Sequence, residues 1–267
     1  MPDDVRSARS AVVLDHVAVG TTTLADGWAL FRGLLGGRWA YGGNSPGFWW
    51  GQLQFSAGPK VELLTPTGGA DSAFLERFLA SRGPGFHHLN FIVPAIKVTL
   101  GKAAALGLEP VGVRLQNPAW KEAFLRPRDA FGTVVQVAEQ AGTPVASSPP
   151  AGLGEPGPSC ELSVIEQRVA DIDGATRLFR EVLDGKVVSR HDAQGDAVAE
   201  LIWPNGARLR LVQPAADREG GLRLAEGVTD VQFSRDDGAF GPADLEQSAV
   251  LSRRLGVSIQ LSGESGY

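Results

Sequence analysis

The stretch FHHLNFIVPAIKVTLGKAAALG, residues 86–107, decides the fold of this chain. Its first eight residues have the apolar and aromatic character of a strand, and residues 95–106 follow as a helix that ends at Gly107. Three more strand-like runs come next, at about 110–115, 120–126 and 132–139. The stretch therefore predicts a unit of one strand, one helix and three strands (βαβββ).

The same unit occurs on both sides of this stretch, and a repeat of this kind sets the whole architecture. The motif LFREVLDGK at 178–186, for example, mirrors LFRGLLGGR at 30–38. The upstream copy has a strand, a helix and two strand-like runs, at 12–19, 24–35, 48–55 and 60–65. The downstream copy has a strand, a helix and three strands, at 160–169, 172–183, 186–190, 197–203 and 207–213.

A Pro/Gly/Ser-rich segment, residues 141–159, separates the two halves and is typical of a linker. A fourth copy begins at 226–234 and continues with a helix near 243–255 and a strand at 257–262. Leu255-Gly256 precedes that strand as Leu106-Gly107 does in the second copy, so the last two strands of the fourth copy are expected to be missing. The sequence predicts an α+β protein of tandem βαβββ units, with domains at 1–142 and 159–267 joined by a linker at 143–158. The second of these domains is expected to be incomplete.

Composition excludes several classes of protein. The net charge is −5, from 25 basic and 30 acidic residues without a basic run, which argues against a nucleic-acid partner. A single cysteine, Cys160, rules out an internal disulfide framework. No stretch approaches the roughly 18 consecutive apolar residues of a membrane span, and the acidic N-terminus does not resemble a signal peptide. A cytoplasmic protein without membrane contact is expected.

Superposing the first two copies brings four polar residues to equivalent places. His16 falls opposite His88, and Glu62 falls opposite Gln136. If the two units curl together, these side chains converge on one cleft, where two imidazoles and one carboxylate can hold a divalent first-row metal. An amide oxygen is a weaker fourth ligand. The alternative is that each histidine is an ordinary buried residue, as His87, which points to the opposite face, is expected to be.

These motifs resemble the vicinal oxygen chelate superfamily of glyoxalase I, methylmalonyl-CoA epimerase and extradiol dioxygenases. The likeness is to the epimerase branch, through VELLTPTGGADSAFLERFLASRGPGFHHLNFIV at 61–93 and AFLRPRDAFGTVVQVAE at 123–139, and it covers roughly residues 12–140. The resemblance implies a metal, one of Fe, Mn, Co, Ni or Zn, held by His16, Glu62, His88 and Gln136.

Two features depart from the pattern of the family. The fourth ligand is commonly Glu, and an amide such as Gln136 cannot transfer a proton as that carboxylate can. The additional Glu of the epimerase, expected before VELL, has no equivalent, because residues 42–60 contain no acid. Methylmalonyl-CoA epimerase itself is therefore not the expected function.

Other residues are candidates for handling a substrate. Glu122 is a candidate general base, and Glu62 is a candidate catalytic residue as well as a candidate metal ligand. Lys121 and Arg126 are candidates for binding a carboxylate or a thioester tail. The alternative is an ordinary exposed strand with Lys and Glu on alternate faces. Phe48 and Trp50 form either the apolar wall of a substrate pocket or part of the core.

The second half lacks the ligand set. Val164, Arg210 and Asp230 stand where the first half has His16, Glu62 and His88, and a fourth metal-bearing strand is expected to be absent. This half is expected to support the fold or to form an interface, for which a homodimer is one arrangement.

The leading hypothesis is a metal-dependent isomerase, epimerase or lyase that stabilises an enolate or enediolate of a small carbonyl, hydroxy-acid or thioester substrate. One alternative is a non-haem Fe(II) ring-cleaving dioxygenase, which uses two histidines and one carboxylate. The other is a metal-free, ligand-sequestering protein of the resistance type, for which the aromatic content of residues 42–55 would suit an apolar cleft.

Overall fold

The structure is a computed structural model that describes residues 11–142, 147–215, 225–235 and 238–263. Its strands form an eight-stranded sheet in the order β2-β3-β4-β1-β5-β8-β7-β6 and a six-stranded sheet in the order β10-β11-β12-β9-β13-β14. These sheets come from residues 13–140 and 160–263. The α+β fold of tandem βαβββ units, with an incomplete second half, is confirmed.

The elements follow the predicted units with two additions. β2 and α3 are not predicted from the sequence, because the Gly-rich β2 resembles a turn and α3 lies between the motifs that define the repeat. The first half contains β1 (Val13–Gly20), α2 (Leu24–Gly27), the π-helix η1 (Trp28–Leu34), β2 (Arg38–Ser45), β3 (Phe48–Gln54), β4 (Lys60–Pro66), η2 (Ala70–Ser72), α3 (Ala73–Arg82), β5 (Gly85–Ile92), α4 (Ile96–Ala105), β6 (Val111–Arg114), β7 (Trp120–Leu125), η3 (Pro127–Asp129) and β8 (Val134–Gln140).

The second half contains β9 (Cys160–Arg168), α5 (Ile172–Glu181), β10 (Lys186–Ala193), β11 (Asp196–Ile202), β12 (Arg208–Gln213), β13 (Gly227–Arg235), α6 (Pro242–Leu255) and β14 (Ser258–Gly263). None of the helices in the described ranges combines the length and the apolar character that a membrane crossing needs.

The strand pairing corrects the expectation about which strands the fourth copy lacks. In the three complete copies the last strand pairs in parallel with the first: β4 with β1, β8 with β5, and β12 with β9. β14 pairs in parallel with β13, directly after α6, and so takes the place of the last strand. Within the described residues, the strands that the fourth copy lacks are therefore the second and third of the unit, not the final two. The prediction relied on Gly256, which ends α6 in the left-handed region at φ 61°. Such a glycine ends a helix whichever strand of the unit follows, so it does not identify that strand.

The chain divides into two compact units, each of which draws on both halves of the sequence. Unit I comprises residues 1–15, 88–143 and 165–228, and unit II comprises residues 16–87, 144–164 and 229–267. Each unit therefore combines one repeat from each half.

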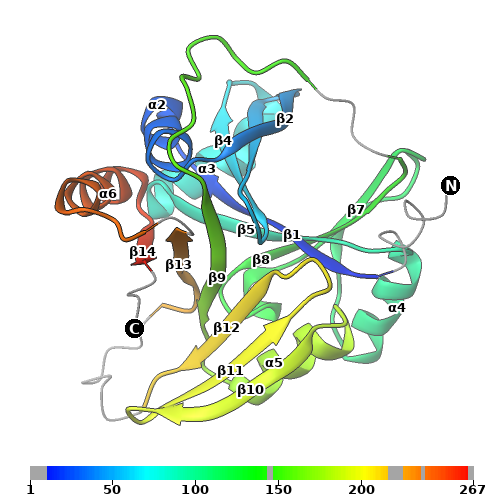
Figure 1. Cartoon of the computed structure of the whole chain (residues 1–267). Helices are drawn as coiled ribbons and strands as arrows, with labels where there is room; N and C mark the ends of the chain where they lie inside the picture. The colour runs from blue at the N-terminus through cyan, green and yellow to red at the C-terminus, as the bar shows by residue number, and fades with distance from the viewer. Residues whose placement is uncertain (1–10, 143–146, 216–224, 236–237, 264–267) are drawn as a thin grey trace, which may run out of the picture. The chain divides into compact units, whose positions relative to one another are not determined.

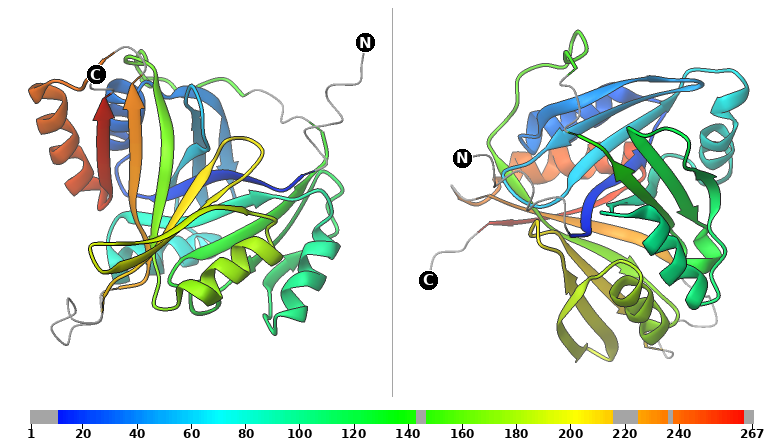
Figure 2. Two further views of the ribbon diagram at one scale, coloured as in Figure 1. Left: turned by 60° about the horizontal axis from the view of Figure 1, so that its bottom comes forward. Right: turned by 90° about the vertical axis from the view of Figure 1, so that its right-hand side faces the viewer.

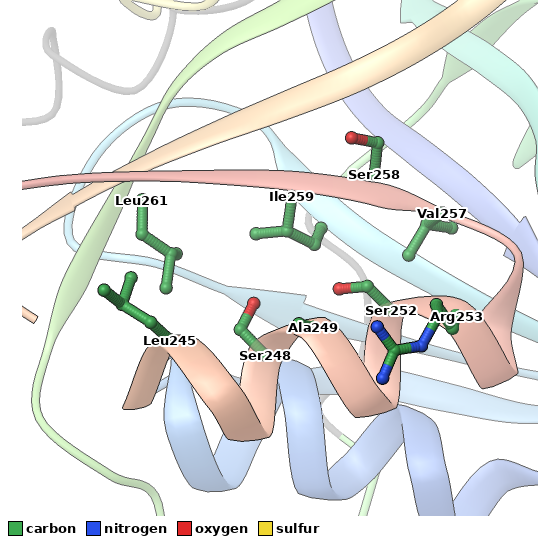
Figure 3. A pocket seen from close by; sticks show the side chains of 9 residues that line it. All are labelled: Leu245, Ser248, Ala249, Ser252, Arg253, Val257, Ser258, Ile259 and Leu261. Atoms are coloured by element: carbon green, nitrogen blue, oxygen red, sulfur yellow. The ribbon is translucent and has the colours of Figure 1, made fainter. Parts of the chain in front are cut away.

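Unit II is held together by aromatic packing between its segments. The ring of Phe233 on β13 lies 4.9 Å from that of Phe55 and 6.4 Å from that of Phe31, measured between centroids. Figure 1 shows α6 beside α2, and the left view of Figure 2 shows α6 running along β14 and β13. A shallow groove lies between α6 and β14, where Ile259 and Leu261 point toward the helix and Ser258 points away (Figure 3).

Unit I has an equivalent contact. Phe91 on β5 packs against Phe179 of α5 and Trp203, with centroids 6.1 Å and 5.2 Å apart. The buried amide of Gln167 donates to the carbonyl oxygens of Ala130 and Phe131, which ties β9 to the loop before β8. Apolar cores in both units thus depend on side chains from each half of the chain.

We therefore expect a fragment ending at residue 142 to be destabilised and prone to aggregate, because it exposes Phe31, Phe55 and Phe91. In the full chain, Phe233→Ala should lower the free energy of unfolding by about 3–5 kcal/mol, as for other buried aromatic truncations. Urea unfolding followed by circular dichroism measures both effects. A soluble 1–142 fragment with the melting temperature of the full chain would show that the halves fold independently.

Candidate metal centre

The first two ligand candidates lie on the parallel neighbours β1 and β4. Ala18 pairs with Glu62 in this register, so the Glu62 side chain is on the same face of the sheet as Ala18 and, two residues earlier, His16. Both side chains are buried, and Nε2 of His16 lies 3.6 Å from Oε1 of Glu62. The hydrogen-bonding pattern of two strands thus brings an imidazole and a carboxylate together.

A third residue of this cluster, Gln52 on β3, was missed by the sequence analysis. It pairs with Glu62 across the β3–β4 hairpin. Its Nε2 donates to Oε2 of Glu62 at 2.7 Å and lies 3.2 Å from Nδ1 of His16. The register of the hairpin was the only signal that could have revealed it, since a strand glutamine is unremarkable by itself.

His88 completes a group of three buried residues. His16, Glu62 and His88 each offer one ligand atom, and these atoms all lie within 4.8 Å of one another. The assignment of these three residues as metal ligands stays a prediction. Two imidazoles and one carboxylate, buried and this close, suit a divalent first-row metal such as Zn²⁺ or Fe²⁺.

His87 belongs to a different environment. Its ring packs edge-on against the rings of Phe78 and Phe74, at 4.8 Å and 5.6 Å between centroids. Burial, with a smaller contribution from the charge of Arg82, lowers the pKa of His87 from its ordinary 6.5 to about 4. The residue is neutral at pH 7, in agreement with the structural role expected for it.

Gln136, the proposed fourth ligand, is engaged by its neighbours. Its Nε2 donates to Oε2 of Glu122 at 2.9 Å, and its Oε1 accepts from Nδ2 of Asn90 at 2.8 Å. Because a carboxylate only accepts, Glu122 fixes which end of the amide faces it. Asn90, two residues after His88, is a further polar residue that the sequence analysis did not select as a candidate. Coordination by Gln136 stays a prediction.

Glu122 sits in a well-defined polar environment on β7. Oε2 accepts from Nε1 of Trp120 at 3.0 Å as well as from Gln136, and Oε1 lies 3.3 Å from the guanidinium of Arg114. The Glu122 side chain is 13% exposed, whereas that of Arg114 is 79% exposed. Oε1 is therefore the oxygen with the more exposed partner.

The basic candidates lie elsewhere. Lys121 points to the other face of β7 and binds Glu139, whose second oxygen accepts from the backbone N–H of Ile96 at the start of α4. Arg126 contacts Asp129 and the carbonyl oxygen of Glu109. Their assignment to substrate binding stays a prediction.

Phe48 and Trp50 pack beside α3. Both lie against a buried cluster of Ala18, Leu64 and Leu75, together with Phe78. Both side chains are partly buried, and their assignment to the wall of a substrate pocket stays a prediction.

The described part of the second half has no equivalent metal group. Arg210 on β12 forms ion pairs with Glu166 and Glu200, at 3.8 Å and 3.5 Å. The fourth strand, expected to be absent, is β14, and it places Gln260 opposite Gln232. Within the described ranges, His16, Glu62 and His88 form the one group of three or more His, Cys, Asp or Glu residues suited to a metal.

Comparison with known proteins places the fold. No model of a known protein family matches the sequence, and no curated protein matches it. A mutant of 4-hydroxymandelate synthase from Streptomyces coelicolor is similar in structure, with a TM-score of 0.59 and 14% identity over 92% of this chain and 75% of that one. A hypothetical protein from Staphylococcus aureus has a TM-score of 0.58 and 9% identity over 94% and 99% of the two chains.

A third similar structure is a xylose isomerase-like TIM barrel/4-hydroxyphenylpyruvate dioxygenase fusion protein. Its TM-score is 0.56 at 15% identity, over 89% of this chain and 38% of that one. The chain has the vicinal oxygen chelate fold.

His16→Ala and His88→Ala should each abolish stoichiometric binding of a divalent metal, because each removes one of two imidazoles from a three-residue set. Gln136→Ala should weaken binding by a smaller factor, since an amide oxygen contributes less. Elemental analysis and titration with Co²⁺ measure both effects. Unchanged metal content in the His16→Ala/His88→Ala double variant would rule out the site.

The Lys121–Glu139 pair yields a pH-dependent prediction. The hydrogen bond from Lys121, followed by that from Ile96, holds the pKa of Glu139 below its ordinary 4.5. The pair therefore contributes stability that is complete above pH 4.5 and is lost as the pH falls through the lower, folded-state value. Glu139→Gln should cost about 0.5–1 kcal/mol at pH 7, as expected for a partly exposed pair at a helix start.

Chemical denaturation at pH 7 and pH 3 tests this difference, with Glu109→Gln as a control on an exposed carboxylate. A Glu139→Gln variant that is less stable by the same amount at both pH values would contradict the assignment.

Proposed function

We propose that this protein is a divalent-metal-dependent enzyme of the glyoxalase or epimerase type, acting on a small carbonyl, hydroxy-acid or thioester substrate. The observation that carries the proposal is the buried group of His16, Glu62 and His88, with ligand atoms within 4.8 Å of one another. When bound, the metal would supply Lewis-acid chemistry, withdrawing electron density from two adjacent oxygens of the substrate. Isomerase, epimerase or lyase activity would follow from this arrangement.

The residues of the chain have separate roles in this proposal. His16, Glu62 and His88 bind the ion, and their burial excludes bulk water. Glu122 accepts the proton from the carbon next to the substrate carbonyl and returns it, through Oε1, whose partner Arg114 is largely exposed. Trp120 and Gln136 hold the other oxygen of Glu122 and so fix the orientation of the carboxylate.

A second candidate function is a non-haem Fe(II) dioxygenase. The structures that cover about nine-tenths of this chain include 4-hydroxymandelate synthase and a 4-hydroxyphenylpyruvate dioxygenase fusion protein. Two histidines and one carboxylate with open positions are also the ligand set of such enzymes. The epimerase-type motifs VELLTP and GFHHLNFIV favour the first candidate.

Anaerobic exchange distinguishes the two candidates. Protein loaded with Mn²⁺, Co²⁺ or Ni²⁺ and incubated in D₂O with a panel of hydroxy-ketones, 2-hydroxy acids and acyl thioesters should exchange the proton on the carbon next to the carbonyl, as detected by NMR. Glu122→Gln should slow exchange by about 10²–10⁴-fold, the usual contribution of a general base. Its metal content should stay unchanged. Activity that requires Fe(II) and consumes oxygen would replace the first candidate with the second.

A further inference from the structure

Gln52 is the polar residue nearest to the proposed ligands that no motif identifies. It is 4% exposed and lies in the middle of β3, paired with Glu62 across the hairpin. Its neighbours in sequence on that strand, Gly51 and Leu53, are buried as well. A fully polar amide in this position requires an explanation, because buried amides are costly unless they form hydrogen bonds.

The amide nitrogen of Gln52 reaches two ligand candidates at once. An amide NH₂ has two hydrogens, and here Nε2 lies 2.7 Å from Oε2 of Glu62 and 3.2 Å from Nδ1 of His16. The carboxylate of Glu62 can only accept, so the nitrogen rather than the oxygen of the amide must face it. One side chain thus ties together residues from two other strands.

The oxygen of the same amide does not contribute a hydrogen bond within the described residues. Oε1 of Gln52 is buried and has no hydrogen-bond partner in the part of the chain that the structure describes. A buried acceptor without a hydrogen bond is destabilising. A leucine or methionine of similar size would avoid that cost, so the stability of the sheet does not account for the glutamine.

We infer that Gln52 is a positioning residue that holds the Glu62 carboxylate in the orientation needed to bind the metal. The inference rests on the proposed function, because it presupposes that Glu62 is a ligand. Groups that orient metal ligands in this way typically account for 10- to 100-fold in metal affinity. The role of Gln52 is to act through Glu62 and not to contact the substrate.

Replacing Gln52 by leucine tests the inference. Gln52→Leu keeps the approximate volume but removes the hydrogen bond to Glu62, so we expect Co²⁺ to bind 10- to 100-fold more weakly in isothermal titration. The visible absorption spectrum of the Co²⁺-loaded protein should also change, because that spectrum reports ligand geometry. The melting temperature of the metal-free protein should stay within a few degrees of the original.

Gln54→Leu is the matched control. Gln54 lies on the same strand two residues away, is exposed, and donates to the backbone oxygen of Phe55. It should leave both Co²⁺ affinity and spectrum unchanged. If Gln52→Leu does not fold, Gln52→Asn serves instead, since it keeps an amide but is one methylene too short to reach both partners.

The outcomes separate this inference from the proposed function. Failure of the original protein to bind Co²⁺ would overturn the proposed function and this inference with it. Binding by the original protein, together with unchanged affinity and spectrum in Gln52→Leu, would overturn the inference alone. An equal loss of affinity in Gln54→Leu would assign the effect to the strand as a whole and would also overturn it.

Discussion

The parallel pairing of the first and last strands of each βαβββ unit is the constraint on which the rest of the structure depends. It sets β4 beside β1 with Ala18 opposite Glu62, and β8 beside β5 with Asn90 opposite Gln136. Side chains two residues apart on a strand share a face. His16 therefore lies on the same face as Glu62, and His88 lies in the equivalent place on the same face as Gln136. The first two repeats thus place the same two strand positions on one face of the sheet, once in each repeat. The chemistry at these positions depends on which side chains occupy them.

The same constraint explains why only one half of the chain carries a candidate site. β12 and β14 pair with β9 and β13 in the same manner, so the backbone framework is retained. The occupants differ: Arg210 is neutralised by Glu166 and Glu200, and Gln260 is exposed on the edge strand. Among the described residues, the fourth unit has no second or third strand, and β14 lies at the end of its sheet.

Around His16 and Glu62, the apolar and the polar side chains form separate sets of contacts. The aromatic side chains Phe48 and Trp50 join the apolar cluster beside α3, while Gln52 places its amide between the imidazole and the carboxylate. Further along the eight-stranded order, Glu122, Gln136 and Asn90 form a second polar chain in which each hydrogen bond fixes the orientation of the next amide. Both networks link residues on different strands, and neither can be recognised from the spacing of residues along the chain.

The sequence by itself determined the repeating unit, the α+β class and the equivalent strand positions of His16 and His88, because strand and helix periodicity and the order of the motifs are local properties. It also drew attention to Glu62, since an acid within an apolar strand is conspicuous. Only the tertiary structure decided that Gln52 donates to Glu62, that Gln136 is held by Asn90 and Glu122, and that Lys121 binds Glu139 at the start of α4. It also decided that β14 is the last strand of its unit, and that each compact unit takes one repeat from each half. Hairpin register and long-range packing fix these features, and neither leaves a periodic signal in the sequence.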